Sequence, residues 1–176
     1  VVRSRGLGDV YKRQSSYSAT VTASDGTNSS TQDIIVTVTN VNDNSPVFTS
    51  GAAFSVVENQ TGISTITATD DDGDTLSFSL SGTDASSMSI NSSSGVLVFD
   101  SAPDYETKTS YSATVTASDG TNSTTQDITV TISNVNDNSP IITSSAFFIA
   151  AENQLSIGTV TATDDDGDTL SFSLSG

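Results

Sequence analysis

The sequence contains no cysteine, no histidine and no tryptophan. Without cysteine there is no disulfide framework. Without cysteine and histidine there is also no Ser-His-Asp or Cys-His nucleophile and no zinc site of the usual tetrahedral kind. The chemistry that remains belongs to carboxylates, amides and hydroxyls, and the chain holds 33 serines and 27 threonines among its 176 residues.

Basic residues are scarce as well, since 5 lysines and arginines stand against 21 acidic residues and the net charge is −16. Four of the five cations lie in the first fourteen residues, so Lys108 is the only cation beyond them. Repulsion by this charge excludes nucleic acid and anionic membrane surfaces as partners. Cations, in contrast, are attracted.

The first residues differ in composition from everything that follows. Residues 4–14 resemble the in-frame translation of a transposase adapter used to prepare sequencing libraries. We therefore interpret residues 1–14 as a non-native leader rather than as part of the fold.

The rest of the chain is a tandem repeat. The segment 17–28 returns as 111–122, the segment 40–46 as 134–140 and the segment 70–82 as 164–176, so that residue 17 recurs as residue 111 and every offset is 94. A period of this length is typical of whole domains in tandem. We expect one complete unit, residues 47–140, between the last part of a preceding unit (15–46) and the first part of the next (141–176). The first junction is residues 40–44 and the second junction is residues 134–138.

Apolar residues make up only 34% of the chain, but they alternate with serine and threonine over short runs. Examples are Tyr111, Ala113, Val115 and Ala117, then Ile128, Val130 and Ile132, and also Leu76, Phe78 and Leu80. Alternation with a period of two predicts half-buried strands, and no stretch shows a helical period. The fold class predicted is all-β, a seven-stranded antiparallel Greek-key β-sandwich of the immunoglobulin-like kind.

The acidic residues are concentrated at strand ends next to the junctions. The groups are Glu58, Asp70 to Asp74, Asp104 with Glu106, Asp119, and Asp137. Alternate residues of a strand point to one side, so Asp70 and Asp72, or Asp104 and Glu106, can offer two carboxylates to one ion. Calcium accepts about 6–8 oxygen ligands in flexible geometry, whereas magnesium resists dehydration, so the predicted cation is calcium.

Other interpretations of these acids are weaker. A solvated acidic turn is the alternative for residues 70–74, but it does not explain why the other groups occur in register. An EF-hand is disfavoured because Thr75 stands at the required glycine and Ser81 at the closing glutamate. Asp104 and Glu106 could be the two carboxylates of a glycosidase, but nothing else in the sequence supplies a cleft or an aromatic platform, so we predict that the chain is not an enzyme.

From Ser15 to Gly176 the chain resembles tandem cadherin repeats. The motifs are Glu-Asn-Gln at 58–60, Asp-Asp-Asp at 70–72, Asp-Tyr-Glu at 104–106, Ala-Ser-Asp at 117–119, and Asn-Val-Asn-Asp-Asn at 134–138 followed by Ser-Pro. Each motif alone is weak, but their order within one repeat is specific.

The resemblance implies three calcium ions at each junction, held by the earlier domain, the linker and the later domain. The ligands implied at the second junction are Glu58, Asp104, Glu106, Asn136, Asp137, the carbonyl of Asn138, Asp164 and Asp166. Those implied at the first junction are Asn42, Asp43, Asn44, Asp70, Asp72 and Asp119. Whether Gly73 or Asp74 gives a further carbonyl ligand stays open.

The resemblance implies that both ligand sets are incomplete within this sequence, with the remaining ligands before Ser15 and after Gly176. We expect two good ion positions and a weakened third at the second junction, and mainly the third at the first. Two departures from the family pattern bear on function. Asn134 stands where the family often has aspartate, and the absence of tryptophan leaves adhesion by strand exchange without support.

The resemblance implies a calcium-binding adhesion module outside the cell or on its surface, in which calcium stiffens a rod of repeats. Its partners would be calcium ions, the neighbouring repeats, and the same protein on another cell or a surface ligand. The alternative is a calcium-stiffened spacer in a large secreted or surface microbial protein without homophilic binding. Residues 17–46 and 111–140 are identical at 26 of 30 positions, which favours a long repetitive array.

Overall fold

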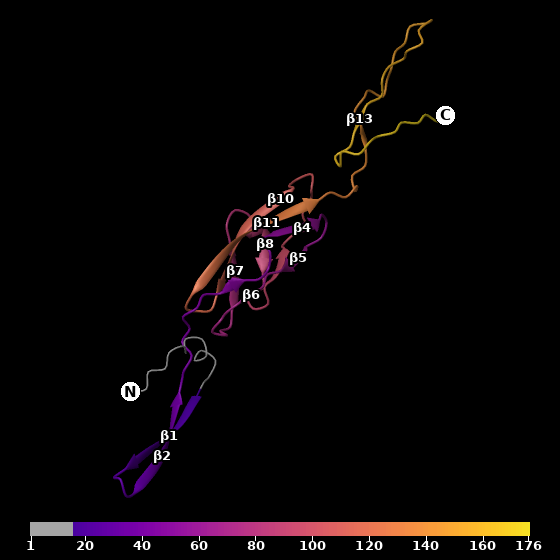
Figure 1. The fold of residues 1–176 in the computed structure, drawn as a ribbon. Coiled ribbons are helices and arrows are strands. Elements are labelled where there is room, and N and C mark those ends of the chain that lie inside the picture. Colours follow the sequence, from indigo (N-terminus) through magenta and orange to yellow (C-terminus); the bar gives the residue numbers. More distant parts are fainter. Residues whose placement is uncertain (1–15) are drawn as a thin grey trace. The chain divides into compact units, whose positions relative to one another are not determined.

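The computed structural model describes residues 16–176, so the predicted leader at residues 1–14 lies outside the described residues. The chain divides into two units, Val1–Asn44 and Ser45–Gly176. Apart from one short 3-10 helix, η2 (Ala85–Ser87), the regular structure of the described residues consists of strands (Figure 1). No helix in residues 16–176 has the length and apolar content needed to cross a membrane.

The described part of the first unit is a β-hairpin. Strand β1 (Ser16–Ser24) pairs with β2 (Ser29–Thr37) in antiparallel register from Ser16 opposite Thr37 to Ser24 opposite Ser29. The turn closes on the Asp25 carboxylate, whose Oδ1 accepts the amide protons of Thr27 at 2.8 Å and Asn28 at 2.7 Å. An aspartate that bonds to the backbone two and three residues on is a local turn signal, so this hairpin forms from its own sequence.

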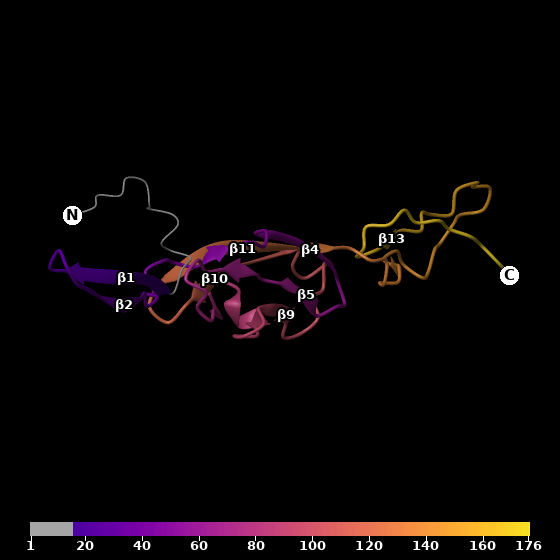
Figure 2. The ribbon, with the colours of Figure 1, turned by 60° about the horizontal axis from the view of Figure 1, so that its bottom comes forward.

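The second unit contains the central sandwich, which is built from two sheets. One sheet has the order β4 (Ala53–Val57), β11 (Ser123–Ser133), β10 (Ser110–Ser118) and β7 (Ser77–Ser81). The other has the order β5 (Gly62–Thr65), β9 (Val96–Phe99) and β8 (Met88–Ile90), and a short pair joins β3 (Val47–Phe48) to β6 (Ala68–Thr69). Figure 2 shows β4, β10 and β11 in one layer and β5 and β9 in the other. The prediction of an all-β sandwich is confirmed.

One pairing in the sandwich is parallel, because β4 lies beside β11 with Ala53 opposite Thr129 and Val57 opposite Ser133. The other strand pairs are antiparallel. Parallel neighbours cannot be joined by a tight turn, so β4 reaches this edge from far away in the sequence. The last residues of β4 and β11 therefore end side by side, which places Glu58 next to the second junction.

The core lies between the two sheets. Its buried residues are Val56, Ile66, Phe78, Met88, Leu97, Phe99, Ala113, Val115, Ala117, Ile128, Val130 and Ile132. The backbones approach closely at Gly95, where φ is +71° and a Cβ would lie 2.1 Å from the carbonyl oxygen of Ile66. Only glycine fits there, since it has no Cβ and adopts positive φ without strain.

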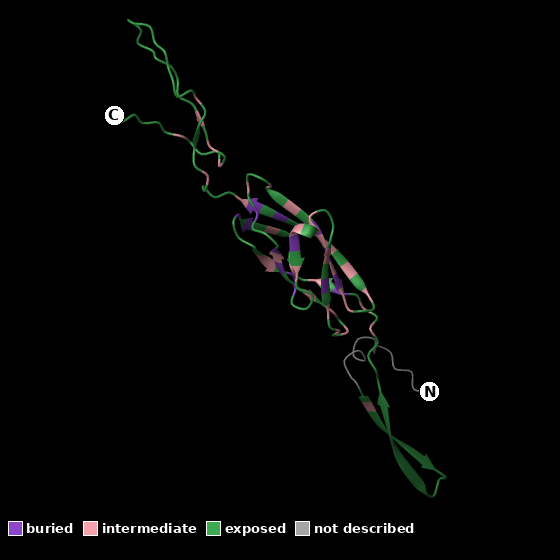
Figure 3. Ribbon diagram, turned by 180° about the vertical axis from the view of Figure 1, so that it is seen from behind, coloured by how far each residue is buried: buried purple, intermediate pink, exposed green. Residues whose placement is uncertain are grey.

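The hairpin β10–β11 repeats the register of β1–β2 at an offset of 94, since Ser110 pairs with Thr131 as Ser16 pairs with Thr37. Burial separates the two copies. Val115 is fully buried, whereas Val21 in the same sequence context is 49% exposed. Figure 3 shows the same contrast between the buried residues of the sandwich and the exposed hairpin.

Beyond the second junction, residues 141–176 form one short strand pair, β12 (Ile141–Ile142) with β13 (Ala162–Thr163). This pair repeats β3 with β6, because Ile141 pairs with Thr163 as Val47 pairs with Thr69. The counterparts of β4, β5 and β7 do not form strands. In the central sandwich these three strands pair with β11, β9 and β10, for which residues 141–176 contain no counterpart.

Truncation of the two repeated valines tests which hairpin is packed. We expect Val115→Ala to lower the free energy of unfolding by about 2 kcal/mol, because it removes buried apolar surface and leaves a cavity. Val21→Ala is the matched control and should change it little. Urea unfolding of both variants checks this, and equal losses would contradict the burial described above.

Candidate metal centre

Glu58 is the buried acid of the central sandwich, with 2% of its surface exposed, and it directly follows β4. Its carboxylate accepts two backbone hydrogen bonds, from the amide of Tyr105 at 2.8 Å and from the amide of Val135 at 2.7 Å. A buried carboxylate is stable only when such donors satisfy it. Glu58 therefore ties the 104–106 segment and the second junction to the end of β4.

Four carboxylates meet at the second junction. Glu58 and Glu106 come from the central sandwich, Asp137 from residues 134–138, and Asp166 from the segment that follows. One oxygen from each lies within 4.8 Å of the others. Like charges repel at such distances, so this arrangement calls for a cation or for strong hydrogen bonds. Oxygen-only ligands in flexible loops suit a hard divalent cation of the calcium kind.

Asp166 is the acid that binds the second junction most extensively. Its Oδ2 accepts the amide protons of Asp137 at 3.1 Å and Asn138 at 2.7 Å, and its Oδ1 accepts the Asn138 side-chain amide at 3.1 Å. The main-chain carbonyl of Asp166 accepts the side-chain amide of Asn134 at 3.0 Å. Asn134, which departs from the family pattern, thus has a hydrogen-bonding role here.

The electrostatics of Glu106 and Asp166 differ. Partial desolvation raises the pKa of Glu106, and the nearby charges of Glu58 and Asp166 raise it further. Desolvation also opposes ionisation of Asp166, but hydrogen bonds from Asn138 and Asp137 outweigh it and lower the pKa of Asp166. A nearby cation would therefore favour the charged form of Glu106.

A second acidic group lies at the other end of the sandwich and consists of Asp70, Asp72 and Asp74, whose carboxylate oxygens lie within 4.8 Å of one another. The Oδ2 atoms of Asp70 and Asp74 are buried and accept no hydrogen bond from residues 16–176. Desolvation raises the pKa of Asp74, and the charges of Asp70, Asp72 and Asp119 add to this effect. Buried oxygens without donors are unfavourable, and cation coordination would satisfy them.

The repeat places the same arrangement after the second junction. Asp164, Asp166 and Asp168 are the counterparts of Asp70, Asp72 and Asp74, and their oxygens also lie within 4.8 Å of one another. Asp166 belongs to both this group and the four-carboxylate group. It can therefore link a cation held by residues 164–168 to one held by the central sandwich.

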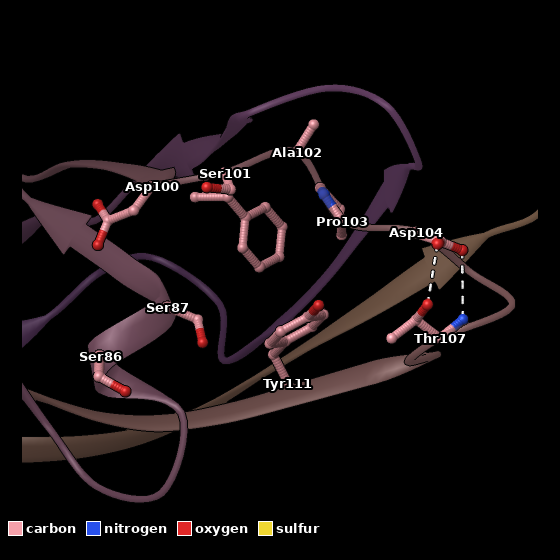
Figure 4. A pocket seen from close by; sticks show the side chains of 10 residues that line it. Ser86, Ser87, Asp100, Ser101, Ala102, Pro103, Asp104, Thr107 and Tyr111 are labelled. Carbon is pink, nitrogen blue, oxygen red and sulfur yellow. Dashed lines mark hydrogen bonds between the residues drawn. The ribbon is translucent and has the colours of Figure 1, made fainter.

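Asp104 has a different environment from the four-carboxylate group. Its carboxylate accepts hydrogen bonds from the Thr107 hydroxyl at 2.8 Å and the Thr107 amide at 3.2 Å, and these lower its pKa (Figure 4). It also lines a pocket on the side of the sandwich, together with Ser86, Ser87, Phe99, Asp100, Ser101, Ala102, Pro103, Thr107 and Tyr111. Asp104 is not one of the four carboxylates of the group, but its carboxyl group interacts with that of Glu106, which belongs to it.

Of the other predicted ligands at the second junction, Asn138 lies against Asp137 and Asp166, whereas Asn136 is exposed. At the first junction, Asn42, Asp43 and Asn44 belong to the first unit, and Asp70, Asp72 and Asp119 belong to the second. The ligand set of the first junction therefore stays a prediction.

The side chains of Asp74 and Asp168 were not among the predicted ligands, since Asp74 was expected to offer at most a main-chain carbonyl. The signal was present, since residues 70, 72 and 74 continue the alternation already used for Asp70 and Asp72. Residues 70–74 lie in the bend between β6 and β7, where Gly73 has φ +79°, so strand alternation does not determine where these side chains point.

The fold and the acidic groups define an all-β sandwich that carries carboxylates where it meets its neighbours in the chain. The family model for the cadherin domain matches residues 52–133. Protocadherin Fat 4 of Mus musculus is 36% identical over 149 residues, which cover 77% of this chain, and protocadherin gamma-A10 of Homo sapiens is 36% identical over 156 residues, which cover 81%. The chain belongs to the cadherin family, as its motifs predicted.

Solved structures agree with this assignment. The protocadherin gammaB7 EC3-6 cis-dimer structure superposes with a TM-score of 0.73 at 28% identity and covers 88% of this chain and 45% of that one. The structure of human CDH23 EC21-23 superposes with a TM-score of 0.70 over 88% of this chain and 59% of that one, at 24% identity, and shares the fold. The cadherin type of sandwich is confirmed.

The chain spans only a small part of its relatives, 3% of Fat 4 and 17% of protocadherin gamma-A10. The module is of the cadherin adhesion type, and domains of this type are not enzymes. Family membership therefore confirms the prediction that the chain is not an enzyme.

Neutralising Asp74 tests the electrostatic strain in its group. Because the pKa of Asp74 is raised, the folded protein disfavours its charged form. That penalty is complete above the raised pKa and fades as the pH falls to the ordinary value of 3.8. We expect Asp74→Asn to raise the thermal midpoint in EGTA at pH 7, with the gain shrinking on acidification. The neighbouring, exposed Asp71 provides the control, since Asp71→Asn should change the midpoint less at either pH.

Proposed function

We propose that this chain is a calcium-binding module of a cell-adhesion protein, in which calcium at the junctions holds successive repeats in line. The observation that carries the proposal is the group formed by Glu58, Glu106, Asp137 and Asp166. Its members come from one sandwich, its linker and the segment after it, so an ion bound by all four ties these three parts together. Membership of the cadherin family supports the choice of calcium.

The residues of the second junction would bind the ion from two sides. Glu58 and Glu106 offer carboxylates on the side of the central sandwich, and Asp137 and Asp166 offer them on the side of the linker and the next segment. Asp104, Asn136, the carbonyl of Asn138 and Asp164 remain candidates to complete the shell of oxygens. Calcium supplies the positive charge that offsets the repulsion among these groups.

The Oδ2 atoms of Asp70 and Asp74, which are buried and accept no hydrogen bond from residues 16–176, support a further calcium position at the other end of the sandwich. We propose that Asp70 and Asp72, with Asp119, act there together with Asn42, Asp43 and Asn44 of the first junction. The repeated group Asp164, Asp166 and Asp168 would serve the second junction in the same way. Each sandwich then carries acids at both ends and shares ions with both neighbours.

A rod of such repeats suits adhesion outside the cell or on its surface, where calcium is abundant. The homophilic partner and the extracellular location are part of the proposal, and the relatives named protocadherin support them. The second candidate is a calcium-stiffened spacer without homophilic binding. Its support is the near-identity of residues 17–46 and 111–140, which favours a long and uniform array.

Calorimetric titration with calcium tests the proposed ligands. We expect at least two classes of site, and we expect Glu106→Gln to weaken the class at the second junction by about tenfold or more, because it removes a charged ligand. Glu152→Gln is the matched control, since Glu152 is exposed and belongs to none of the acidic groups within residues 16–176. Absence of calcium binding, or one uniform class unaffected by Glu106→Gln, would contradict the proposal.

Sedimentation of a protein with three complete repeats separates the two candidate functions. Adhesion requires self-association in calcium that is lost in EGTA. A spacer instead stays monomeric in both and only changes its frictional ratio as the junctions stiffen. A frictional ratio that is the same in calcium and in EGTA would count against both.

A further inference from the structure

The residue after Glu58 has an unusual backbone. Asn59 has φ +62°, and its counterpart in the next repeat, Asn153, has φ +64°; they are the non-glycine residues with positive φ in residues 16–176. This left-handed region costs energy for residues with a side chain, and asparagine tolerates it better than most. In both repeats, therefore, the residue that directly follows the glutamate of the Glu-Asn-Gln motif is an asparagine with a left-handed backbone.

The left-handed turn sends two consecutive side chains to different partners. The carboxylate of Glu58 bonds to the amides of Tyr105 and Val135. The side-chain amide of Asn59 instead donates to Oδ2 of Asp137 at 2.6 Å. Two neighbouring residues thus make hydrogen bonds to three others, Tyr105, Val135 and Asp137.

Main-chain hydrogen bonds fix Asn59 itself. The amide of Glu58 donates to the carbonyl of Ser133 at 3.1 Å, and the amide of Asn59 donates to the carbonyl of Pro103 at 3.0 Å. These bonds anchor the turn between the segment that carries Glu106 and the end of β11. The Asn59 side chain consequently bonds to Asp137 from a backbone position that these main-chain bonds hold in place.

We propose that Asn59 is a positioning residue of the junction, which holds the Asp137 carboxylate where a cation can bind it. Asp137 Oδ2 accepts the bond from Asn59, and Oδ1 accepts one from the Asn138 side chain at 3.0 Å. A carboxylate has about four lone-pair sites, so two remain for a metal ion. The inference rests on the proposed calcium function and adds a residue that does not itself bind the ion.

Asn153 provides the comparison within the same chain. It shares the Glu-Asn-Gln sequence and the left-handed backbone of Asn59, but it makes no side-chain hydrogen bond within residues 16–176. Replacing either asparagine with glycine keeps a residue that adopts positive φ without strain. Asn59→Gly then removes the bond to Asp137, whereas Asn153→Gly reports the effect of glycine alone.

The test is a calcium titration of the 176-residue chain and both variants, followed by NMR and produced in a bacterial host that does not glycosylate asparagine. The backbone amides of Tyr105 and Val135 report the second junction, and those of Asp72 and Gly73 report the Asp70 group in the same sample. Outer residues that orient metal ligands typically contribute 10–100-fold to metal affinity. We expect Asn59→Gly to weaken binding at the second junction by about tenfold, with the Asp70 group and the Asn153→Gly variant unchanged.

Equal affinity in Asn59→Gly and the parent chain overturns the inference, as does an equal loss in Asn153→Gly. If the parent chain binds no calcium, the proposed function fails, which is a distinct outcome. A measurement on the unaltered chain covers the case in which Asn59→Gly does not fold. In EGTA, the side-chain amide protons of Asn59 should exchange more slowly than those of Asn153, and equal rates contradict the inference.

Discussion

The crowding of carboxylates at the ends of the sandwich is the constraint on which the rest of this structure depends. Lys108, the cation beyond the first residues, pairs with Asp84 and lies 4.5 Å from the centre of the Tyr111 ring, so it is committed elsewhere. Within residues 16–176, the acidic groups are therefore balanced by backbone amides and side-chain amides, and by the cation that we propose they bind. At the second junction, the carboxylates of Glu58 and Asp166 accept hydrogen bonds from backbone amides. These bonds offset part of the repulsion where acids from three segments converge.

Burial in this chain follows from context rather than from local sequence. Strands β1 and β10 have the same sequence and the same hairpin register, yet the valine they share is exposed in one and buried in the other. Strand formation is local, because the alternating pattern and the Asp-Gly turn encode it. Burial requires a second sheet, and among residues 16–176 the central sandwich supplies it.

The acidic sites could be predicted only in part from the sequence. Glu58, Glu106, Asp137 and Asp166, which lie close together, are all among the predicted ligands, because their motifs carry carboxylates at fixed spacing. The hydrogen bonds of Asp104 to Thr107, the participation of Asp74 and the contact of Asn59 with Asp137 could not be predicted from the sequence. Each depends on a rotamer or on a left-handed turn, and neither follows from residue type alone.

By itself, the sequence determined that the chain repeats, that apolar residues alternate along its strands and that its acids gather next to the junctions, and it predicted calcium as their cation. Those properties depend on residue order and on the chemistry of single side chains. The tertiary structure decided which acids meet, because β4 and β11 end side by side only after a parallel pairing between residues 76 positions apart, and this pairing also brings Asn59 to Asp137. Long-range pairing of this kind leaves no local pattern in the sequence, so the geometry of the junction follows only from the tertiary structure.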